Sequence, residues 1–250
     1  MARATLRGRL TWLVGEVVSR VDETARVRSL VLDCPDWPGH QPGQHVDIRL
    51  TADDGYQAER SYSIATPADG SRVTVTVERI DGGEVSPYLV DELQVGDRLE
   101  LRGPIGGWFV WKPELGGPLL LVAGGSGLVP LMAMVRARVA TGSDAPVRLL
   151  LSARTAEDVI YAAELGTISG GRVGVDVVQT LTRAQPPGWS GYRRRVDREM
   201  VAEVAWPVME KPRCYVCGPT GFVETVASAL VEIGHDPQNI RTERFGPTGG

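Results

Sequence analysis

Apolar and polar positions follow two different patterns along the chain, and the change comes near residue 110. Before about residue 103, short segments alternate between apolar and polar positions, as Val73, Val75 and Val77 do within residues 72–79. A period of two predicts strands with one buried and one solvent-exposed face. Turn sequences rich in Gly, Pro and Asp separate these segments at intervals typical of an antiparallel barrel or sandwich.

Beyond the connector GPIGGWFVWKPELGGP, apolar runs of strand length alternate with segments of helical period. Strands are predicted at 119–125, 147–154, 173–182 and 213–219, and helices at 129–140, 156–166, 197–206 and 222–234. Such a βα repeat implies a parallel sheet covered by helices on both faces. We therefore expect two domains, an N-terminal antiparallel β-barrel in residues 1–110 and a C-terminal α/β domain with a parallel sheet in residues 111–250.

The composition of the 250 residues narrows the class of protein. A hydrophobic content of 42% and a charged content of 23% are those of a soluble globular protein, and the net charge of -4 includes no basic block that would favour nucleic acid or an anionic membrane. No apolar run approaches the roughly 18 residues of a membrane span, and the N-terminus lacks the apolar core of a signal sequence. Three cysteines provide no disulfide framework, so we expect a cytoplasmic protein.

The segment LLLVAGGSGLVPLMAM, residues 119–134, contains the strongest local signal. A buried strand ends in Gly124, Gly125 and Gly127, and a helix follows with Pro130 in its first turn. Glycines let the backbone approach a pyrophosphate, and a helix N-terminus offers free N–H groups and a positive dipole end. A purely structural strand-to-helix turn is the alternative, since the spacing departs from the G-x-G-x-x-G fingerprint.

Two arginines follow the next two strands. Ser152 and Arg154 close the strand at 147–154, where folds that bind NAD often carry a carboxylate for the ribose 2′-hydroxyl, and Arg183 closes the following strand. Because carboxyl ends of parallel strands share one edge, both arginines are expected there, and their charge favours a 2′-phosphate. Either arginine alone could equally be an ordinary surface charge.

Cys214 and Cys217 form a C-x-x-C pattern, which could indicate a redox or zinc site. Residues three apart in a strand point to opposite faces, so we expect these thiols neither to pair nor to bind one metal ion. Cys217 lies at the carboxyl end of its strand, followed by the turn residues Gly218 and Pro219, where it could touch a ligand. The histidines His40, His45 and His235 are scattered and are not expected to be ligands.

Polar and aromatic residues also replace aliphatic ones in the first half, in RSYSIATP at 60–67. Arg60 and Tyr62 share a strand face, so a guanidinium could bind a phosphate while a ring stacks on a flat heterocycle. Downstream, Gly82 and Gly83 allow close approach to phosphate oxygens, and Ser86 lies at an expected helix start. Ordinary barrel packing would also explain Tyr62.

These motifs together resemble the ferredoxin-NADP reductase family of flavoproteins over nearly the whole chain. R-S-Y-S at 60–63 is similar to the family's flavin motif, G-E-V-S at 83–86 to its flavin-pyrophosphate motif, GGSGLVP at 124–130 to its pyridine-nucleotide turn and CGP at 217–219 to its nicotinamide-side motif. The resemblance implies FAD in the barrel and NADP, with NAD possible, in the α/β domain. The cysteine cluster of a [2Fe-2S] centre is absent from the sequence, and no metal site is expected.

The resemblance also implies roles for individual residues. Arg60 would bind FAD phosphates, Tyr62 would stack beside the isoalloxazine, and Ser63 would hydrogen-bond near flavin N5. Cys217 would lie beside the nicotinamide, and TERFG at 242–246 is similar to the family's terminal strand, which makes Glu243 and Phe245 candidates beside the flavin. The implied cofactor-binding set is Arg60, Tyr62, Ser63, Gly82, Gly83, Val85, Ser86, Gly124, Gly125, Gly127, Pro130, Ser152, Arg154, Arg183, Cys217, Gly218, Pro219 and Phe245, and the implied catalytic set is Ser63, Cys217 and Glu243.

The function expected from this resemblance is FAD-dependent transfer of electrons from NADPH to a separate redox protein such as ferredoxin or flavodoxin. Arg72, Arg79, Arg244 and the terminal GPTGG are expected near the docking surface for an acidic partner. One alternative is the reductase component of a multi-protein oxygenase or molybdenum-type oxidoreductase. Another, of a different class, is a non-catalytic nucleotide-binding interaction module.

Overall fold

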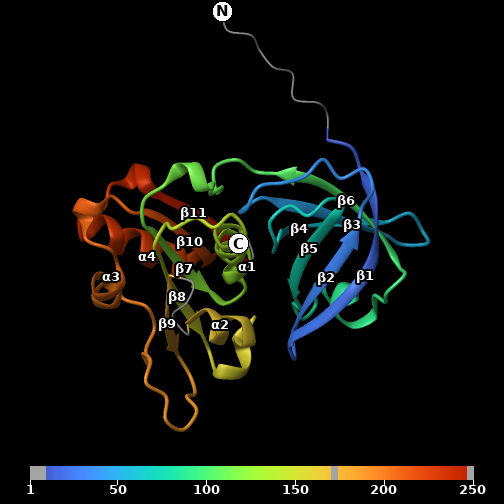
Figure 1. Cartoon of the computed structure of the whole chain (residues 1–250). Helices are drawn as coiled ribbons and strands as arrows, with labels where there is room; N and C mark the ends of the chain where they lie inside the picture. Colours follow the sequence, from blue (N-terminus) through green and yellow to red (C-terminus); the bar gives the residue numbers. More distant parts are fainter. Residues whose placement is uncertain (1–9, 170–173, 247–250) are drawn as a thin grey trace, which may run out of the picture.

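Antiparallel pairing of six strands builds the first half of the chain in the computed structural model, which describes residues 10–169 and 174–246 (Figure 1). The strands are β1 (Leu13–Thr24), β2 (Val27–Asp33), β3 (His45–Thr51), β4 (Gln57–Ser63), β5 (Arg72–Glu78) and β6 (Arg98–Ile105), in the order β4-β3-β6-β1-β2-β5. A bridge between Ile64 and Val75 brings the end of β4 against β5, so the two edge strands meet. The predicted antiparallel barrel is confirmed.

The alternation in β5 produces the expected buried face, with one exception on the other face. Val73, Val75 and Val77 are fully buried in the barrel core. Thr76 belongs to the face that the sequence predicts to be exposed, yet it is only 5% exposed. The prediction is wrong at this residue because the hydroxyl of Tyr161, from the second domain, covers Thr76.

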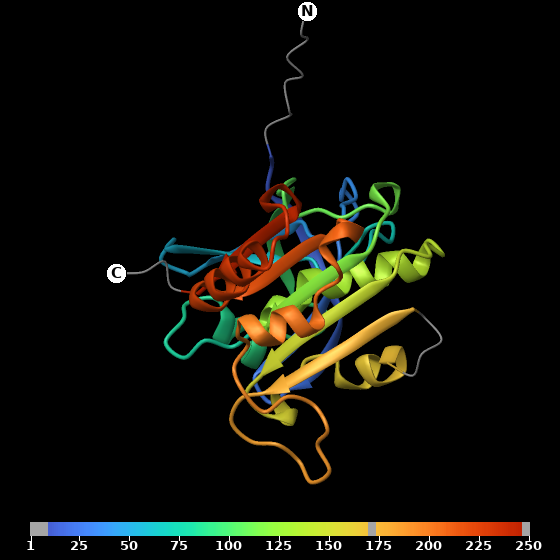
Figure 2. The same cartoon turned by 90° about the vertical axis from the view of Figure 1, so that its left-hand side faces the viewer.

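Five parallel strands form the second half (Figure 2). They are β7 (Leu119–Gly124), β8 (Val147–Ala153), β9 (Val175–Leu181), β10 (Arg213–Pro219) and β11 (Ile240–Phe245), in the order β11-β10-β7-β8-β9. The helices are α1 (Leu128–Ala140), α2 (Ala162–Ser169), α3 (Arg198–Val204) and α4 (Thr220–Glu232). Separate apolar clusters fill the two faces of the sheet, one including α1 and α2 residues and the other α3 and α4 residues, which confirms the predicted α/β domain.

The helix predicted over 156–166 is wrong in its first half. A capping box between Thr155 and Asp158 closes a single 3-10 turn, Ala156–Asp158. Val159 is then extended and Tyr161 adopts a left-handed backbone with φ of 58°, so α2 begins only at Ala162. The other short helical elements are a π-helical turn at Tyr88–Glu92 and 3-10 turns at Pro113–Leu115, Gly125–Gly127, Val208–Glu210 and Pro237–Asn239.

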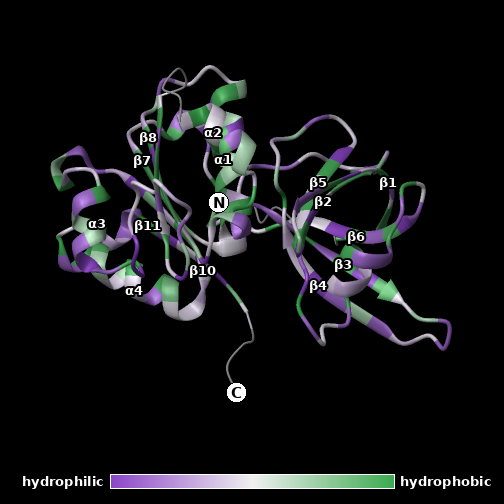
Figure 3. Cartoon of the chain, turned by 90° about the horizontal axis from the view of Figure 1, so that it is seen from below, coloured by the Kyte–Doolittle hydropathy of each residue, from purple (hydrophilic) through white to green (hydrophobic). Residues whose placement is uncertain are grey.

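The two lobes meet along α1 and β10, which lie on the side of the α/β lobe that faces the barrel (Figure 3). Gly43 of the barrel leaves no room for a side chain, because a Cβ there would lie 1.8 Å from the carbonyl oxygen of Phe109.

No helix within residues 10–169 and 174–246 is long and apolar enough to cross a membrane.

Candidate functional site

The carboxyl ends of the parallel strands form one edge of the sheet, and we call residues 123–127, 152–154, 181–183, 217–219 and 243–245 the rim. In the register of the sheet, Cys217 is the neighbour of Ala123 on one side and of Glu243 on the other. A Cβ at Gly127 would lie 2.2 Å from the carbonyl oxygen of Cys217. The Gly-rich turn therefore lies directly against the end of β10, and only glycine fits there.

Glycine is needed at the rim positions for two different reasons. Gly124 and Gly218 make room for the ring of Phe222, because a Cβ on either would lie within 2.9 Å of that ring. Gly125 has φ of 57° and open space around its Cβ position, so its backbone faces free volume in a conformation that favours glycine. With Pro130 in the first turn of α1, the predicted strand-turn-helix is confirmed, and it forms a cradle suited to a pyrophosphate.

Glu243 and Cys217 are ionisable neighbours at the centre of the rim. Burial raises the pKa of the Glu243 carboxyl to about 7. Burial, and then the nearby Glu243 charge, raise the pKa of the Cys217 thiol well above its usual value, so Cys217 is a neutral thiol. The Glu243 carboxyl group makes no hydrogen bond or ion pair with any described residue. Cys214 lies in the apolar cluster on the opposite face of the sheet, which confirms that the two cysteines do not act together.

Arg154 and Arg183 are brought together at the β8–β9 end of the rim. The amide of Arg183 donates to the carbonyl of Arg154 at 2.9 Å. Both side chains are exposed, and neither forms an ion pair or side-chain hydrogen bond with the described residues. Ser152, in β8, pairs in register with Gly124. The arrangement therefore presents two cations and a hydroxyl beside the Gly-rich turn.

Across the domain junction lies the barrel edge, which we define as residues 60–63 and 80–86. Arg60 and Tyr62 lie on the same face of β4, as predicted. Tyr62 packs against the barrel core and burial raises its pKa, whereas Arg60 is exposed. The Arg60 guanidinium is 2.9 Å from a carboxylate oxygen of Glu84, and the Tyr56 hydroxyl donates to the same carboxylate. Ser63 ends β4 and pairs in register with His45.

The turn at 80–86 combines one glycine in open space with one closely packed glycine, as expected of a phosphate loop. Gly82 has φ of 73° with open space around it, whereas a Cβ on Gly83 would lie 3.0 Å from the Ile80 carbonyl oxygen. The Ser86 hydroxyl accepts a hydrogen bond from the Ile80 amide and so closes the turn. Val85 is fully buried and anchors the loop in the barrel core, just before the π-helical turn at Tyr88–Glu92.

The barrel edge and the rim lie close together. β5 packs against the Gly125–Gly127 turn, and Ala65, two residues after Ser63, belongs to the same apolar cluster as Cys217. Phe245, the last residue of β11, is half-buried against this cluster. The R-S-Y-S, GGSGLVP and CGP motifs thus lie at one junction, and the G-E-V-S motif is linked to them through the pair of Glu84 with Arg60. The predicted GPTGG terminus from residue 247 onward lies outside the described residues.

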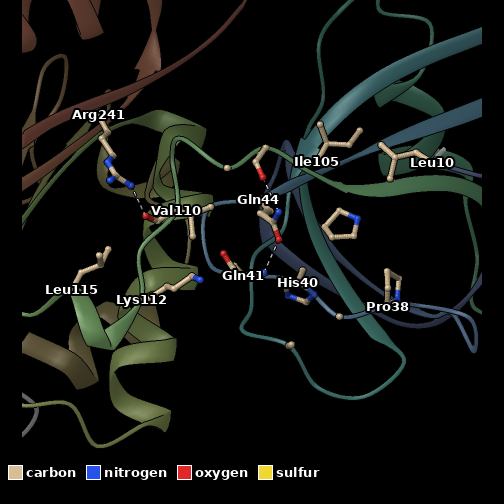
Figure 4. A pocket seen from close by; sticks show the side chains of 15 residues that line it. Leu10, Pro38, His40, Gln41, Gln44, Ile105, Val110, Lys112, Leu115 and Arg241 are labelled. Atoms are coloured by element: carbon tan, nitrogen blue, oxygen red, sulfur yellow. Dashed lines mark hydrogen bonds between the residues drawn. The ribbon is translucent and has the colours of Figure 1, made fainter. Parts of the chain in front are cut away.

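A large hollow of about 1210 Å³ lies elsewhere along the junction (Figure 4). Its lining includes Lys112 and Arg241, together with His40 and Gln44 from the barrel. Arg241 stands at the amino end of β11, roughly 13 Å along the strand from Phe245. The Arg241 guanidinium donates to the carbonyl oxygens of Trp108 and Val110, so it ties the connector to the sheet. This hollow is therefore separate from the rim.

Sequence reasoning missed two features of this site. It placed Arg60 as a free phosphate ligand, whereas Glu84 already pairs with it. It also overlooked Arg136, which joins α1 to the barrel by donating to the Ala65 carbonyl at 2.7 Å. The available signal was a charge within a helix that is otherwise nearly all apolar. The residues present nevertheless fit a flavin dinucleotide and a pyridine dinucleotide, because Gly82 and Gly125 form open backbone cradles while arginines lie beside both.

Comparison with known proteins gives the same two parts. An Oxidoreductase FAD-binding domain matches residues 16–110 and an Oxidoreductase NAD-binding domain matches residues 121–228. Ferredoxin--NADP reductase B of Sorangium cellulosum is 35% identical over 211 residues, covering 82% of this chain and 85% of the relative. The glycine betaine monooxygenase reductase subunit of Pseudomonas aeruginosa is 31% identical over 95% of this chain, which spans 66% of that relative's length.

Among solved structures, the flavohem-like FAD/NAD binding domain of nitric oxide dioxygenase from Vibrio cholerae superposes with a TM-score of 0.83 at 27% identity, covering 94% of this chain and 99% of the other. FAD and a pyridine nucleotide are accordingly the cofactors of the two domains. The antiparallel barrel, the parallel-sheet domain and the relatives that match both agree with the resemblance in the sequence motifs. The chain belongs to the ferredoxin-NADP reductase family of FAD-dependent oxidoreductases.

Proposed function

We propose that this protein is a reductase that takes electrons from NADPH through FAD and passes them to a separate redox protein. The observation that carries the proposal is the meeting of two motifs at one junction: the strand with Tyr62 and Ser63, and the rim with Cys217 and Glu243. In this proposal the FAD domain is residues 1–110 and the NAD(P) domain residues 111–250, divided in the connector between β6 and β7.

The barrel edge would hold FAD. Arg60 would bind its phosphates, exchanging Glu84 for a stronger charge-assisted contact, and the Gly82–Gly83 backbone would approach the same phosphates. Tyr62 would lie against the isoalloxazine, and Val85 and Ser86 would hold the loop in shape. Phe245 would contact the ring system from the end of β11.

The rim would hold the pyridine nucleotide. Gly124, Gly125 and Gly127, with the N-terminus of α1 at Pro130, would receive the pyrophosphate. Cys217, Gly218 and Pro219 would lie along the nicotinamide. Ser152, Arg154 and Arg183 would bind the 2′-phosphate, which is why we propose NADPH over NADH.

When bound, FAD would supply the redox chemistry, because a flavin can accept a hydride and release electrons singly or as a pair. The protein's part is orientation and a controlled polar environment. Ser63, Cys217 and Glu243 would surround the point of transfer, with the uncharged Cys217 thiol acting by contact and not as a nucleophile. Glu243, whose pKa is about 7, could hold or release a proton near neutral pH.

The acceptor would be a separate electron-carrier protein. One relative is named a ferredoxin-NADP reductase, and others are named reductase subunits or components of monooxygenase and dioxygenase systems. Two of the three predicted docking arginines form ion pairs: Arg79 with Asp81 and Asp91, and Arg244 with Glu224. Among these three arginines, only Arg72 forms no ion pair with the described residues. An oxygenase component is the second candidate for the acceptor. It is favoured by the similarity to the glycine betaine monooxygenase reductase subunit, which extends over 95% of this chain.

The test is the visible spectrum of the purified, FAD-loaded chain before and after anaerobic NADPH, followed by a panel of ferredoxins, flavodoxins and oxygenase components. Bleaching of the flavin band and fast reduction of a carrier protein are expected. An unbleached spectrum would reject the reductase. Bleaching with efficient turnover of a small quinone only, and no carrier protein reduced faster than by free FAD, would reject the protein acceptor.

A further inference from the structure

One side chain of α1 reaches from the nucleotide domain into the barrel. Arg136 forms a fork with Glu164 of α2 and donates from its third nitrogen to the Ala65 carbonyl at 2.7 Å. Its guanidinium carbon lies 4.4 Å from the centre of the Tyr161 ring. With 20% of its side chain exposed, Arg136 has its charge neutralised by Glu164 and its donors used on both sides of the junction.

The Tyr161 hydroxyl makes a second link across the junction. Ser29 donates its hydroxyl hydrogen to Glu23, so Thr76 donates to Ser29 and Tyr161 donates to Thr76. Burial raises the pKa of Tyr161, which keeps the phenol protonated and able to donate. The result is a directional hydrogen-bond chain from the second domain into three barrel strands, β5, β2 and β1.

The backbone conformation of Tyr161 indicates that the contact between Tyr161 and the barrel is a specific one. Tyr161 has φ of 58°, a left-handed backbone conformation that side chains other than glycine disfavour. The residue is 5% exposed, held by the Thr76 hydroxyl and the Arg136 guanidinium. These contacts hold its side chain toward the barrel, and α2 starts at the next residue.

Both links act on segments that carry the proposed chemistry. α1 starts directly after the Gly125–Gly127 turn, and Ala65 follows Ser63 by two residues. Interfaces between domains of one chain generally permit relative motion unless they are large and apolar. Hydride transfer needs the donor and acceptor atoms within about 3 to 3.5 Å, and a displacement of about 1 Å can slow it roughly hundredfold.

We propose that Arg136 and Tyr161 are positioning residues that fix the rim against the barrel edge and thereby set the rate of hydride transfer. This inference rests on the proposed reductase function. Arg136 and Tyr161 belong to neither cofactor-binding motif, and neither would contact a reacting atom. They act through Ala65, two residues after Ser63, and through Thr76 in β5.

Arg148 provides a matched control within the second domain. It pairs with Asp176, donates to the Val204 carbonyl at 2.7 Å and lies 4.2 Å above the Trp206 ring. Its side chain is 24% exposed. Arg148→Ala therefore removes the same three kinds of contact as Arg136→Ala, but none of them crosses the junction.

The first measurement is stopped-flow reduction of the FAD-loaded chain at saturating NADPH. Arg136→Ala should lower the limiting rate roughly ten- to hundredfold, with FAD content and the NADPH dissociation constant within about twofold of wild type. Arg136→Lys should recover part of the rate. Tyr161→Phe and Thr76→Val should each lower the rate several-fold, and the double variant should equal the single ones because both remove one shared hydrogen bond.

The second measurement does not depend on activity. All three native cysteines are buried, so spin labels can be placed selectively at Asp53→Cys in the barrel and Glu199→Cys in α3, both exposed positions. The label-to-label distance distribution in the FAD-loaded chain should broaden in Arg136→Ala and in Tyr161→Phe. It should stay narrow in Arg148→Ala.

The outcomes separate the two proposals. If wild type is not reduced by NADPH, the proposed function fails. If wild type is reduced but Arg136→Ala behaves as Arg148→Ala in rate and distance distribution, the positioning role is overturned. Should Arg136→Ala not fold, Tyr161→Phe and Thr76→Val decide the matter, since each removes one hydroxyl and wild-type rates with a narrow distribution in both would overturn it.

Discussion

The barrel edge and the rim differ in how far their charged side chains are paired within the chain. At the barrel edge Arg60 pairs with Glu84, and Arg79, the residue just before the edge, pairs with Asp81 and Asp91. At the rim Arg244 pairs with Glu224, but Arg154, Arg183 and Glu243 form no ion pair with the described residues. One phosphate-binding candidate is therefore electrostatically satisfied within the chain, and the other is open.

This difference suits two ligands with different lifetimes on the protein. An exposed ion pair contributes only about 0.2 to 1 kcal/mol, so a phosphate can displace Glu84 from Arg60 at small cost. The pair would keep the edge ordered until a resident cofactor binds. A rim with unpaired charges would instead attract a nucleotide that binds and leaves in each cycle.

Retention of FAD should show the largest effect. Arg60→Ala would remove the proposed charge-assisted contact with an FAD phosphate, about 1.5 to 3 kcal/mol, so the dissociation constant for FAD should rise roughly ten- to hundredfold. Flavin content after dialysis, and fluorescence titration of the stripped protein, measure it. Arg198→Ala, which breaks a similarly exposed pair with Glu232, is the control. Equal flavin content in the Arg60 and Arg198 variants would remove Arg60 from the site.

The preference for NADPH over NADH should depend on the two unpaired arginines of the rim. An Arg154→Ala, Arg183→Ala double variant should lose roughly tenfold or more of kcat/KM for NADPH while changing little with NADH, because only NADPH carries the 2′-phosphate. Steady-state kinetics with both nucleotides provide the values. A parallel fall for NADPH and NADH would indicate damage to the fold and not loss of a phosphate contact.

Glu243 should make the stability of the chain depend on pH. Its folded-state pKa of about 7 exceeds the unfolded value of roughly 4.3, so its stabilising contribution is complete at low pH and is lost as pH rises through 7. Glu243→Gln should therefore gain about 1 to 2 kcal/mol of unfolding free energy relative to wild type between pH 5 and 8, after discounting for partial exposure. Urea unfolding of the FAD-free proteins measures it, and parallel pH curves would refute the burial argument.

The smallest expected effect tests the competition at the barrel edge. Glu84→Gln removes the charge that pairs with Arg60, so FAD should bind up to about fivefold more tightly. Glu232→Gln, which removes the partner of Arg198, is the matched control. Weaker FAD binding in Glu84→Gln would show that Glu84 orients Arg60 instead of competing for it.

Local pattern was sufficient for most of the fold. The alternation in β5, the βα repeat and the opposite faces of Cys214 and Cys217 follow from periodicity within a few residues, and the structure confirms them. The helix expected from residue 156 does not form there, because the Thr155–Asp158 capping box closes a single 3-10 turn and Tyr161 is left-handed.

The site was less predictable, for a physical reason. Motif spacing indicated which residues gather at the rim, because carboxyl ends of parallel strands share an edge. The pairing of Arg60 with Glu84 and the contact of Thr76 with Tyr161 join residues 24 and 85 positions apart. Such contacts depend on how finished elements pack, and no local pattern encodes them.

The most direct test of the contrast between barrel edge and rim is the ratio of kcat/KM for NADPH to that for NADH, measured at saturating FAD in three proteins. Wild type and Arg60→Ala should give the same ratio, favouring NADPH, because Arg60 is proposed to bind FAD and not the pyridine nucleotide. In the Arg154→Ala, Arg183→Ala variant the ratio should collapse toward one. A ratio that is equal in all three proteins, or that falls in Arg60→Ala as far as in the double variant, would contradict the account.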